Sequence, residues 1–529
     1  MFPIYLTGLS GAGKSTIGPM LAGRLGLPFL DLDTLIEADA GRSVSAIFEA
    51  EGEPGFRSRE HQALARVAQG PLAVVGLGGG TLLAEANRHL VEGAEVIWLE
   101  VSAETAASRL VGRTDRPLLR VGSPAATLAG LLVERQYGYH TAATRRIATD
   151  GLEPSAVAES LAAGLLTPRE LACRFDGHEY PVRIVTRGMD SLHDLVGRLN
   201  VRHAAIITDQ NVAPLYTSSV ANVAQELGLK HSVHVFPAGE DGKSLSTVET
   251  LMRSLRAAEV DRGGCILALG GGVVGDVAGF VAATYLRGLP VVQVPTTLLA
   301  QVDSSVGGKT GVNLDAEKNL IGAFHPPSGV LASMATLDTL PEPVYRAGFA
   351  ELLKHGVIAD PALTTALTRN PDAIAARVPL ALARWVRASV AVKRDIVESD
   401  PREKGRRKVL NFGHTFGHAF ETASHFELSH GDAVALGMLV ATWLGERLGE
   451  TDAGTYEALH AALTAIGLPT DWQRRLNDRV LHHLLADKKR AGTDLDFVFA
   501  RRIGEVDIRK VPLNTIQDLA TAARSSGPA

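Results

Sequence analysis

The chain has 529 residues, of which 46% are apolar and 21% charged, and its formal net charge is −5 at pH 7. This composition is typical of a soluble globular protein, and the length predicts at least two domains. So mild a charge argues against a nucleic-acid-binding surface and against a membrane-bound face. The N-terminus has no basic region or cleavage site, and the longest apolar tract carries Asp276 and several glycines, so we expect no secretory signal and no transmembrane segment. Cys173 and Cys265, the two cysteines, form no C-x-x-C pattern, which favours a reducing, cytoplasmic compartment.

The first third of the chain alternates short apolar runs with amphipathic helical stretches. The runs lie at residues 3–8, 27–33, 72–80 and 94–101. Such alternation predicts parallel βαβ units. We therefore expect an α/β domain with a parallel sheet at residues 1–166.

A fresh extended segment begins at Thr167, and a second alternating region follows it. Its apolar runs include residues 264–272 and 289–297. After Pro341 the periodicity becomes helical and stays mostly so. The sequence thus predicts an α/β lobe at residues 167–341 and a mainly helical lobe at residues 342–529.

The stretch "GLSGAGKST", which begins at Gly8, matches the phosphate-loop pattern G-x-x-x-x-G-K-[ST] between an expected strand and an expected helix. Backbone N–H groups of such a loop converge on phosphate oxygens, its lysine reaches the β/γ-phosphates, and its serine ligates Mg²⁺. The loop alone indicates a phosphoryl donor and leaves the acceptor open. The residues predicted to bind the donor are Gly11, Gly13, Lys14, Ser15 and Thr16.

Two aspartates follow in "FLDLD", on alternate positions at the expected carboxyl end of a strand. There, Asp31 can serve the shell of the metal ion and Asp33 can meet a substrate hydroxyl. A single aspartate at this place would be better explained as a helix N-cap, whereas a pair beside a phosphate loop favours the site.

Five motifs after the loop, "DLDTLIE", "GFRSRE", "GLGGGTLL", "GRTDRPLL" and "ERQYGY", resemble the shikimate kinases in the same order, over residues 2 to about 165. The resemblance implies ATP with Mg²⁺ as donor, shikimate as acceptor and Arg116 on a lid over ATP, with Lys14, Asp33 and Arg116 catalytic. An arginine fork matches the carboxylate of such an acceptor. The implied shikimate-binding residues are Asp33, Arg57, Gly79, Gly80 and Arg135.

The stretch "ILALGGGVVGDVAGF" predicts a strand, a glycine turn and the start of a helix, which would let a pyrophosphate approach the backbone. It is not G-x-G-x-x-G, and a tight structural turn explains it equally well. Metal ligands are suggested further on by His414, His418 and His430, together with Glu351, because imidazoles and a carboxylate form catalytic zinc sites. Spacing alone would pair His414 with His418, one helical turn apart.

Six motifs of the second region, "GEDGKS", "GGGVVGD", "VPTTLLAQVDSSVGGKTGVN", "EKNLIGAFHPP", "AELLKHG" and "NFGHTFGHAFE", resemble 3-dehydroquinate synthase over residues 175 to about 515. By that resemblance Zn²⁺ (or Co²⁺) is held by Glu351, His414 and His430, while His418 turns toward substrate. The implied NAD⁺-binding residues are Asp209, Glu240, Lys243, Gly271, Gly272, Val273, Val274, Gly275, Asp276, Thr296, Thr297, Lys309, Lys318, Thr336 and Thr339.

The same resemblance assigns a cationic group to a sugar phosphate that bears a carboxylate. Either Lys488 or Lys489 would reach this ligand, and the sequence does not distinguish them. An uncharged polyol would give no reason to gather such cations. Besides His418, the implied catalytic and substrate-contacting residues are Asp303, Lys309, Lys354, Lys393, Glu403, Arg407 and Asn411.

Together these resemblances predict a cytoplasmic bifunctional enzyme of the shikimate pathway: a P-loop kinase followed by a two-lobed synthase. The kinase would phosphorylate the 3-hydroxyl of shikimate. The synthase would convert 3-deoxy-D-arabino-heptulosonate 7-phosphate to 3-dehydroquinate and phosphate, with NAD⁺ reduced and restored in each turnover. A homodimer through the synthase half is expected, with small molecules as the other partners. Two alternatives stay open: another sugar phosphate cyclase or a metal-dependent polyol dehydrogenase in the second half, and a non-catalytic nucleotide-binding module in the first.

Overall fold

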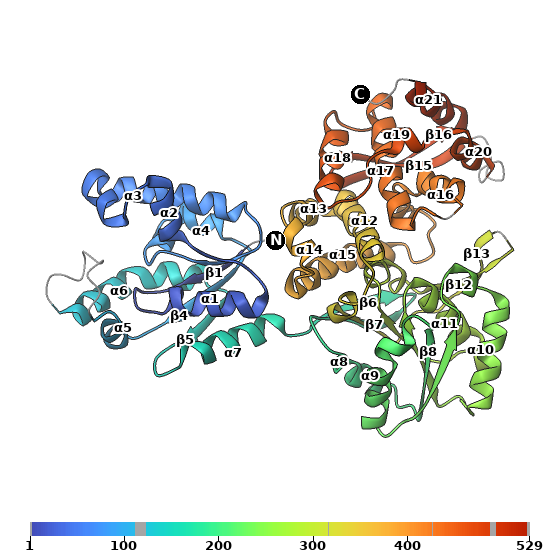
Figure 1. The fold of residues 1–529 in the computed structure, drawn as a ribbon, viewed down its shortest axis with the longest axis horizontal. Coiled ribbons are helices and arrows are strands. Elements are labelled where there is room, and N and C mark those ends of the chain that lie inside the picture. Colours follow the sequence, from blue (N-terminus) through green and yellow to red (C-terminus); the bar gives the residue numbers. More distant parts are fainter. Residues whose placement is uncertain (1–2, 112–122, 316, 426, 487–493, 526–529) are drawn as a thin grey trace. The chain divides into compact units, whose positions relative to one another are not determined.

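The computed structural model describes residues 3–111, 123–315, 317–425, 427–486 and 494–525 (Figure 1). The chain forms two compact units, Met1–Thr167 and Pro168–Ala529. Within the described ranges, no helix combines the length and the apolarity that crossing a membrane would require.

The first unit is a parallel five-stranded sheet in the order β2-β3-β1-β4-β5. Its central strand β1 is buried at every position, because it has a strand on each side and helices over both faces, so its sequence is an unbroken apolar run. The strands are β1 (Ile4–Thr7), β2 (Phe29–Asp31), β3 (Val74–Gly76), β4 (Glu95–Glu100) and β5 (Arg145–Ala148). The helices are α1 (Lys14–Leu25), α2 (Leu32–Ala40), α3 (Val44–Ala68), α4 (Glu85–Leu90), α5 (Ala103–Arg109), α6 (Pro124–Ala142) and α7 (Pro154–Leu166).

The second unit begins with a seven-stranded sheet in the order β6-β7-β14-β11-β10-β8-β9, parallel except for the β6–β7 pair. Residues of α9 (Ala213–Glu226) share one apolar cluster with one face, and those of α10 (Leu245–Ala257) and α11 (Gly272–Thr284) share another cluster. The strands are β6 (Arg169–Phe175), β7 (His178–Val185), β8 (His203–Asp209), β9 (Lys230–Phe236), β10 (Gly264–Gly270), β11 (Val291–Pro295) and β14 (Gly329–Ser333).

The strand order reverses between the neighbours β8 and β10, since β8 continues to β9 on one side and β10 to β11 on the other. At such a switch point the helices that follow the two strands diverge to opposite faces and leave a crevice at the carboxyl ends, where open α/β sheets bind ligands. Asp209 ends β8 and Gly270 ends β10, so both lie at this crevice.

The remainder of the second unit is mainly helical, as predicted, and the α/β fold class is confirmed. The helix α17 (His430–Leu448) is buried along most of its length against α16 (His414–Ala423) and α12 (Glu342–Ala359), which explains its apolar sequence. An antiparallel hairpin, β15 (Asp494–Arg502) and β16 (Glu505–Pro512), was not predicted. The α/β lobe also contains α8 (Ser191–Gly197) and a second hairpin, which joins β12 (Lys309–Leu314) and β13 (Glu317–Phe324). The helices of the helical lobe are α12 (Glu342–Ala359), α13 (Pro361–Thr368), α14 (Pro371–Ala375), α15 (Pro379–Ser399), α16 (His414–Ala423), α17 (His430–Leu448), α18 (Thr455–Ala465), α19 (Trp472–Arg475), α20 (Asp478–Ala486) and α21 (Leu513–Ser525).

Candidate functional sites

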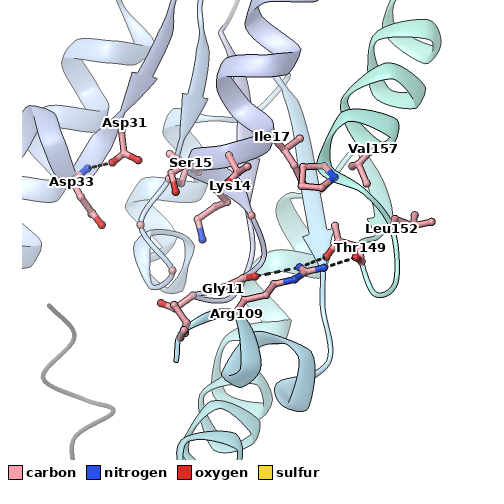
Figure 2. A pocket seen from close by; sticks show the side chains of 18 of the residues that line it. Gly11, Lys14, Ser15, Ile17, Asp31, Asp33, Arg109, Thr149, Leu152 and Val157 are labelled. Atoms are coloured by element: carbon pink, nitrogen blue, oxygen red, sulfur yellow. Dashed lines mark hydrogen bonds between the residues drawn. The ribbon is translucent and has the colours of Figure 1, made fainter. Parts of the chain in front are cut away.

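The phosphate loop joins β1 to α1 in the first unit (Figure 2). Gly13 caps α1 with φ 96°, a left-handed conformation that favours glycine. A Cβ at Gly8 would lie 2.4 Å from the carbonyl oxygen of Leu99, so the close approach to β4 also requires glycine. Nζ of Lys14 donates to the carbonyl oxygens of Gly8 and Leu9 at 2.7 and 3.1 Å. The ammonium is therefore held within the loop that the sequence assigns to phosphates.

A cavity of about 410 Å³ opens at this loop. It extends from the start of α1 to the two aspartates, Asp31 at the end of β2 and Asp33 in α2, and to the loop after β3. The nucleotide residues predicted from sequence lie in its wall, together with both aspartates. The lining includes Gly11, Gly13, Lys14, Ser15, Thr16, Asp31, Asp33, Gly78, Gly79, Arg109 and Thr149 (Figure 2).

Arg109, at the end of α5, is a lining residue that sequence reasoning missed. Its guanidinium donates to the Gly11 carbonyl at 3.3 Å, to the Thr149 carbonyl at 2.6 Å and to the Thr149 hydroxyl at 3.2 Å (Figure 2). It therefore ties the phosphate loop to the segment after β5. A lone arginine outside any motif carries no signal of this role, because the two contacts are distant in sequence.

The two aspartates occupy different elements. Oδ1 of Asp31 accepts from the backbone N–H groups of Asp33 and Thr34 at 3.1 and 3.4 Å, which makes Asp31 the N-cap of α2. The strand β2 therefore ends at Asp31, and Asp33 lies in the first turn of α2 instead of on the strand. Both side chains still line the cavity, and their assignment to magnesium and acceptor stays a prediction.

The loop after β3 collects the residues predicted to hold the acceptor. A Cβ at Gly80 would lie 2.5 Å from Nη2 of Arg57, and one at Gly79 would lie 2.9 Å from Nη1 of Arg135. Oδ1 of Asp33 lies near the neighbouring Gly78, 3.2 Å from the position that a Cβ there would take. The structure thus brings one carboxylate and two guanidinium groups to a single glycine loop at the cavity. Arg116 lies outside the described residues.

A buried carboxylate positions Arg57. Nη1 of Arg57 donates to Oε2 of Glu60 at 2.8 Å, and the Thr81 hydroxyl donates to Oε1 of the same carboxylate at 2.5 Å. The Glu60 side chain is 1% exposed. The ion pair therefore fixes one edge of the guanidinium, and sequence reasoning did not identify Glu60.

The metal candidates of the second unit come together from three helices. Glu351 lies on α12, and His414 and His430 are the first residues of α16 and α17. One ligand atom of each lies within 4.8 Å of the others, with Oε1 of Glu351 3.5 Å from Nε2 of His414 and 3.6 Å from Nε2 of His430. On the other ring nitrogens, Nδ1 of His414 faces the Phe412 carbonyl at 3.2 Å, and Nδ1 of His430 faces Glu421 at 3.4 Å. Such outer partners orient Nε2 toward a shared ion.

The chemistry of Glu351 fits a cation. Its side chain is fully buried, and among the described residues neither carboxylate oxygen has a well-formed hydrogen bond. Burial alone would raise the pKa of this carboxyl, but the Lys354 ammonium and the two imidazoles hold it well below its usual value. A carboxylate with two imidazoles is a ligand set of catalytic zinc. The residues present therefore fit the predicted divalent metal.

His418 lies beside this cluster, with ring centroids 5.5 Å from His414 and 6.1 Å from His430, and is not part of the three-residue group. A second close group consists of Asp303, Glu351 and His355. Its charge is already balanced, because Lys393 contacts Asp303 at 2.5 Å and Lys354 contacts Glu351.

The predicted substrate cations surround these groups, each with a partner. Lys309 pairs with Glu403, whose Oε1 also accepts from Asn411 at 3.2 Å. The guanidinium of Arg407 donates to the carbonyl oxygens of Pro401 at 2.6 Å and Gly307 at 3.3 Å. Lys488 and Lys489 lie outside the described residues.

Most of the predicted NAD⁺ residues flank the switch-point crevice. The backbone N–H groups of Asn211 and Val212 donate to Oδ1 of Asp209, both at 2.9 Å, and Nζ of Lys243 donates to Oδ2 of Asp276 at 2.6 Å. The turn at the start of α11 packs against the segment after β11. The residues of this turn and segment are Gly271, Gly272, Val273, Val274, Gly275, Thr296 and Thr297.

Other predicted NAD⁺ residues make contacts within the same unit. Oγ1 of Thr336 bonds to Ser333 and Gln301 in the interior, and the Thr339 hydroxyl contacts Tyr216 at 2.5 Å. Glu240 accepts from Asn313 at 2.8 Å. Lys318 reaches Glu421, on the side of the metal candidates.

Three family models match the chain: shikimate kinase at residues 10–165, 3-dehydroquinate synthase N-terminal at 233–347 and 3-dehydroquinate synthase C-terminal at 348–490. The chain is 46% identical over 331 residues to 3-dehydroquinate synthase from Symbiobacterium thermophilum, which covers 62% of this chain and 92% of that protein.

Solved structures also resemble the second unit. A 2-deoxy-scyllo-inosose synthase complexed with carbaglucose-6-phosphate, NAD⁺ and Co²⁺ is 25% identical with a TM-score of 0.60, covering 68% of this chain and 99% of that chain. The 2-epi-5-epi-valiolone synthase from Streptomyces hygroscopicus, with NAD⁺ and Zn²⁺ bound, is 27% identical with a TM-score of 0.60, covering 67% and 99%. The chain belongs to the 3-dehydroquinate synthase family and carries a shikimate kinase domain ahead of the synthase, so it is a bifunctional shikimate-pathway enzyme, a kinase joined to a lyase.

Proposed function

We propose that the first unit transfers the γ-phosphoryl group of ATP, with Mg²⁺, to the 3-hydroxyl of shikimate. The observation that carries this proposal is the meeting of Asp33, Arg57 and Arg135 at the glycine loop of a cavity whose other wall is the phosphate loop. Two guanidinium groups suit a carboxylate acceptor. Asp33 accepts the proton of the hydroxyl as its oxygen attacks phosphorus and ADP leaves.

We propose that the second unit converts 3-deoxy-D-arabino-heptulosonate 7-phosphate to 3-dehydroquinate and phosphate. The supporting observation is that Glu351, His414 and His430 form a metal-ligand set in the same unit as a switch-point crevice. When bound, a divalent metal polarises a substrate hydroxyl, and NAD⁺ takes up a hydride and later returns it. The chain itself supplies cations, Lys354, Lys393 and Arg407, that attract the carboxylate and the phosphate of the substrate.

The kinase proposal is tested by Lys14→Ala in the full chain. This change removes the ammonium of the phosphate loop, so ATP-dependent phosphorylation of shikimate should disappear while release of phosphate from the heptulosonate phosphate continues. Both rates are measured on the same preparation. Loss of both activities would contradict independent sites, and retention of kinase activity would contradict the role of the loop. The same assay decides against a non-catalytic first unit.

The synthase proposal is tested with substoichiometric NAD⁺. Because the hydride returns to the product, one equivalent of NAD⁺ should support many turnovers, with phosphate release and no build-up of NADH. The absorbance of NADH and free phosphate are followed together. NADH that accumulates in step with product would favour the alternative, a metal-dependent polyol dehydrogenase. Failure with this substrate but turnover of another sugar phosphate would favour a related cyclase.

We further propose a cytoplasmic homodimer that associates through the synthase unit, as its family resemblance suggests. The measurement is the mass in solution of the full chain and of residues 1–167 and 168–529 expressed separately. A dimer of the second fragment and a monomer of the first is the expected result. A monomeric second fragment would refute the assignment.

A further inference from the structure

One carboxylate of the helical lobe contacts two residues with separate predicted roles. Oε2 of Glu421 faces Nδ1 of His430 at 3.4 Å, and Oε1 accepts from Nζ of Lys318 at 2.8 Å. His430 belongs to the metal-ligand set, whereas Lys318 lies on β13 of the α/β lobe and is predicted to bind NAD⁺. Glu421 therefore lies between the metal candidates and a cofactor candidate, and no sequence motif assigned it a function.

The position of Glu421 is well defined. It follows His414 by seven residues on α16, so both lie on one face of this helix. Its side chain is 11% exposed. Both carboxylate oxygens of Glu421 are engaged, Oε2 by His430 and Oε1 by Lys318. A buried anion needs cationic or N–H partners, and here two groups share one carboxylate.

These two partners compete for the same negative charge. With a metal bound at Nε2, His430 would become a stronger Nδ1–H donor to Glu421. Glu421 would then need less help from Lys318, whose ammonium would be easier to draw toward an anionic group of the cofactor. Conversely, if Lys318 turned to the cofactor, Glu421 would hold His430 more firmly.

We propose that Glu421 is a positioning residue that couples metal binding at His430 to NAD⁺ binding at Lys318. This inference rests on the proposed function of the second unit. Each ligand strengthens the binding of the other, and by linkage both affinities change by the same factor. The coupling needs Glu421 and Lys318, while the orientation of His430 needs only Glu421.

The experiment measures the dissociation constant of NAD⁺ by calorimetry on the full chain, stripped of metal by dialysis against a chelator and then with or without added zinc. Zinc should lower this constant about fivefold or more in the wild-type protein. In Glu421→Ala and in Lys318→Met, the ratio of the NAD⁺ dissociation constants without and with zinc should fall to about one. Glu421→Gln keeps the side-chain volume without the charge and should also reduce the ratio, which guards against misfolding of the alanine variant.

Zinc affinity, measured by competition with a chromophoric chelator, separates the two partners. Glu421→Ala should weaken zinc binding by about 10- to 100-fold, because His430 loses its outer partner, whereas Lys318→Met should leave it within about threefold. Two controls change exposed residues. Glu457→Ala replaces an exposed glutamate of α18, and Lys230→Met replaces a lysine of β9 that pairs with Glu259 at the surface.

A wild-type ratio of one, or a ratio that survives in Glu421→Ala, overturns the coupling. If the wild-type protein still turns over the heptulosonate phosphate with catalytic NAD⁺, the proposed function stands and only the coupling falls. If it binds neither NAD⁺ nor zinc, both proposals fail.

Discussion

Replacing Gly80 with alanine should weaken shikimate binding selectively. Gly80 has φ −109° and ψ −2°, a conformation that alanine adopts without strain, so the added methyl group acts through its contacts alone. Its Cβ would lie 2.5 Å from Nη2 and 2.9 Å from Nη1 of Arg57. The guanidinium must therefore move away from the loop and from its place opposite Glu60.

The expected magnitude follows from the proposed hydrogen bond between Arg57 and the carboxylate of shikimate, which the displacement would break. A hydrogen bond to a charged group contributes about 1.5–3 kcal/mol, which corresponds to about 10- to 150-fold in affinity. We expect the dissociation constant of shikimate, measured by calorimetry, to rise within this range, and that of ATP to change less than about twofold. Gly130→Ala is the matched control, because a Cβ there meets nothing within 4 Å on α6.

A double-mutant cycle tests the cause. If the methyl group acts by displacing Arg57, adding Gly80→Ala to Arg57→Ala should produce little further loss. Fully additive effects would refute this reasoning, and so would weaker ATP binding with shikimate binding unchanged.

Three further predictions concern the second unit. His430→Ala should strip zinc, measured by metal analysis, whereas His418→Ala should retain zinc and lose turnover; zinc loss from the latter would overturn the ligand assignment. Gly307→Ala should lower stability and weaken substrate binding, because φ is 103° and a Cβ would lie 2.8 Å from Nη2 of Arg407; unchanged urea midpoint and KM would contradict this. Burial and His203 lower the pKa of His234 to about 4. As the pH falls, the unfolded chain therefore takes up the proton first, near pH 6.5. The stability that this group contributes is complete above pH 6.5 and is lost toward pH 4, by up to about 3 kcal/mol. His234→Gln should flatten this slope in urea unfolding, and an unchanged slope would exclude His234 as its source.

Much of the fold could be predicted because it depends on local patterns. Buried parallel strands such as β1 and β10 are continuous apolar runs, and a glycine turn after each one leads directly into a helix. The β15–β16 hairpin was missed, since nothing local distinguishes its apolar residues, such as Val498 opposite Ile508, from those of a helical region. The phosphate loop was recognisable for the same reason as the strands, because all its parts lie within nine residues.

The sites could be predicted only where a motif is local. Residue types and spacing indicated His414 and His430, but spacing alone favoured His418, because a three-helix meeting point is invisible in one helix. Glu60 and Glu421 were not identified, although each contacts a predicted residue. Their contacts depend on side-chain direction and burial, which periodicity does not determine.

The lysines of the synthase site are already paired with carboxylates. A count of lysines and arginines suggests an open positive pocket, but Lys309, Lys354 and Lys393 pair with carboxylates of the same chain. Binding a phosphate or carboxylate must then exchange one ion pair for another, so affinity depends on the difference between two attractions and not on the number of cations. Each carboxylate released needs a new partner, and the metal candidate at Glu351 provides one. A site built in this way discriminates by geometry, because only a ligand whose anionic groups match the spacing of these lysines can replace their carboxylates without leaving a buried charge unpaired.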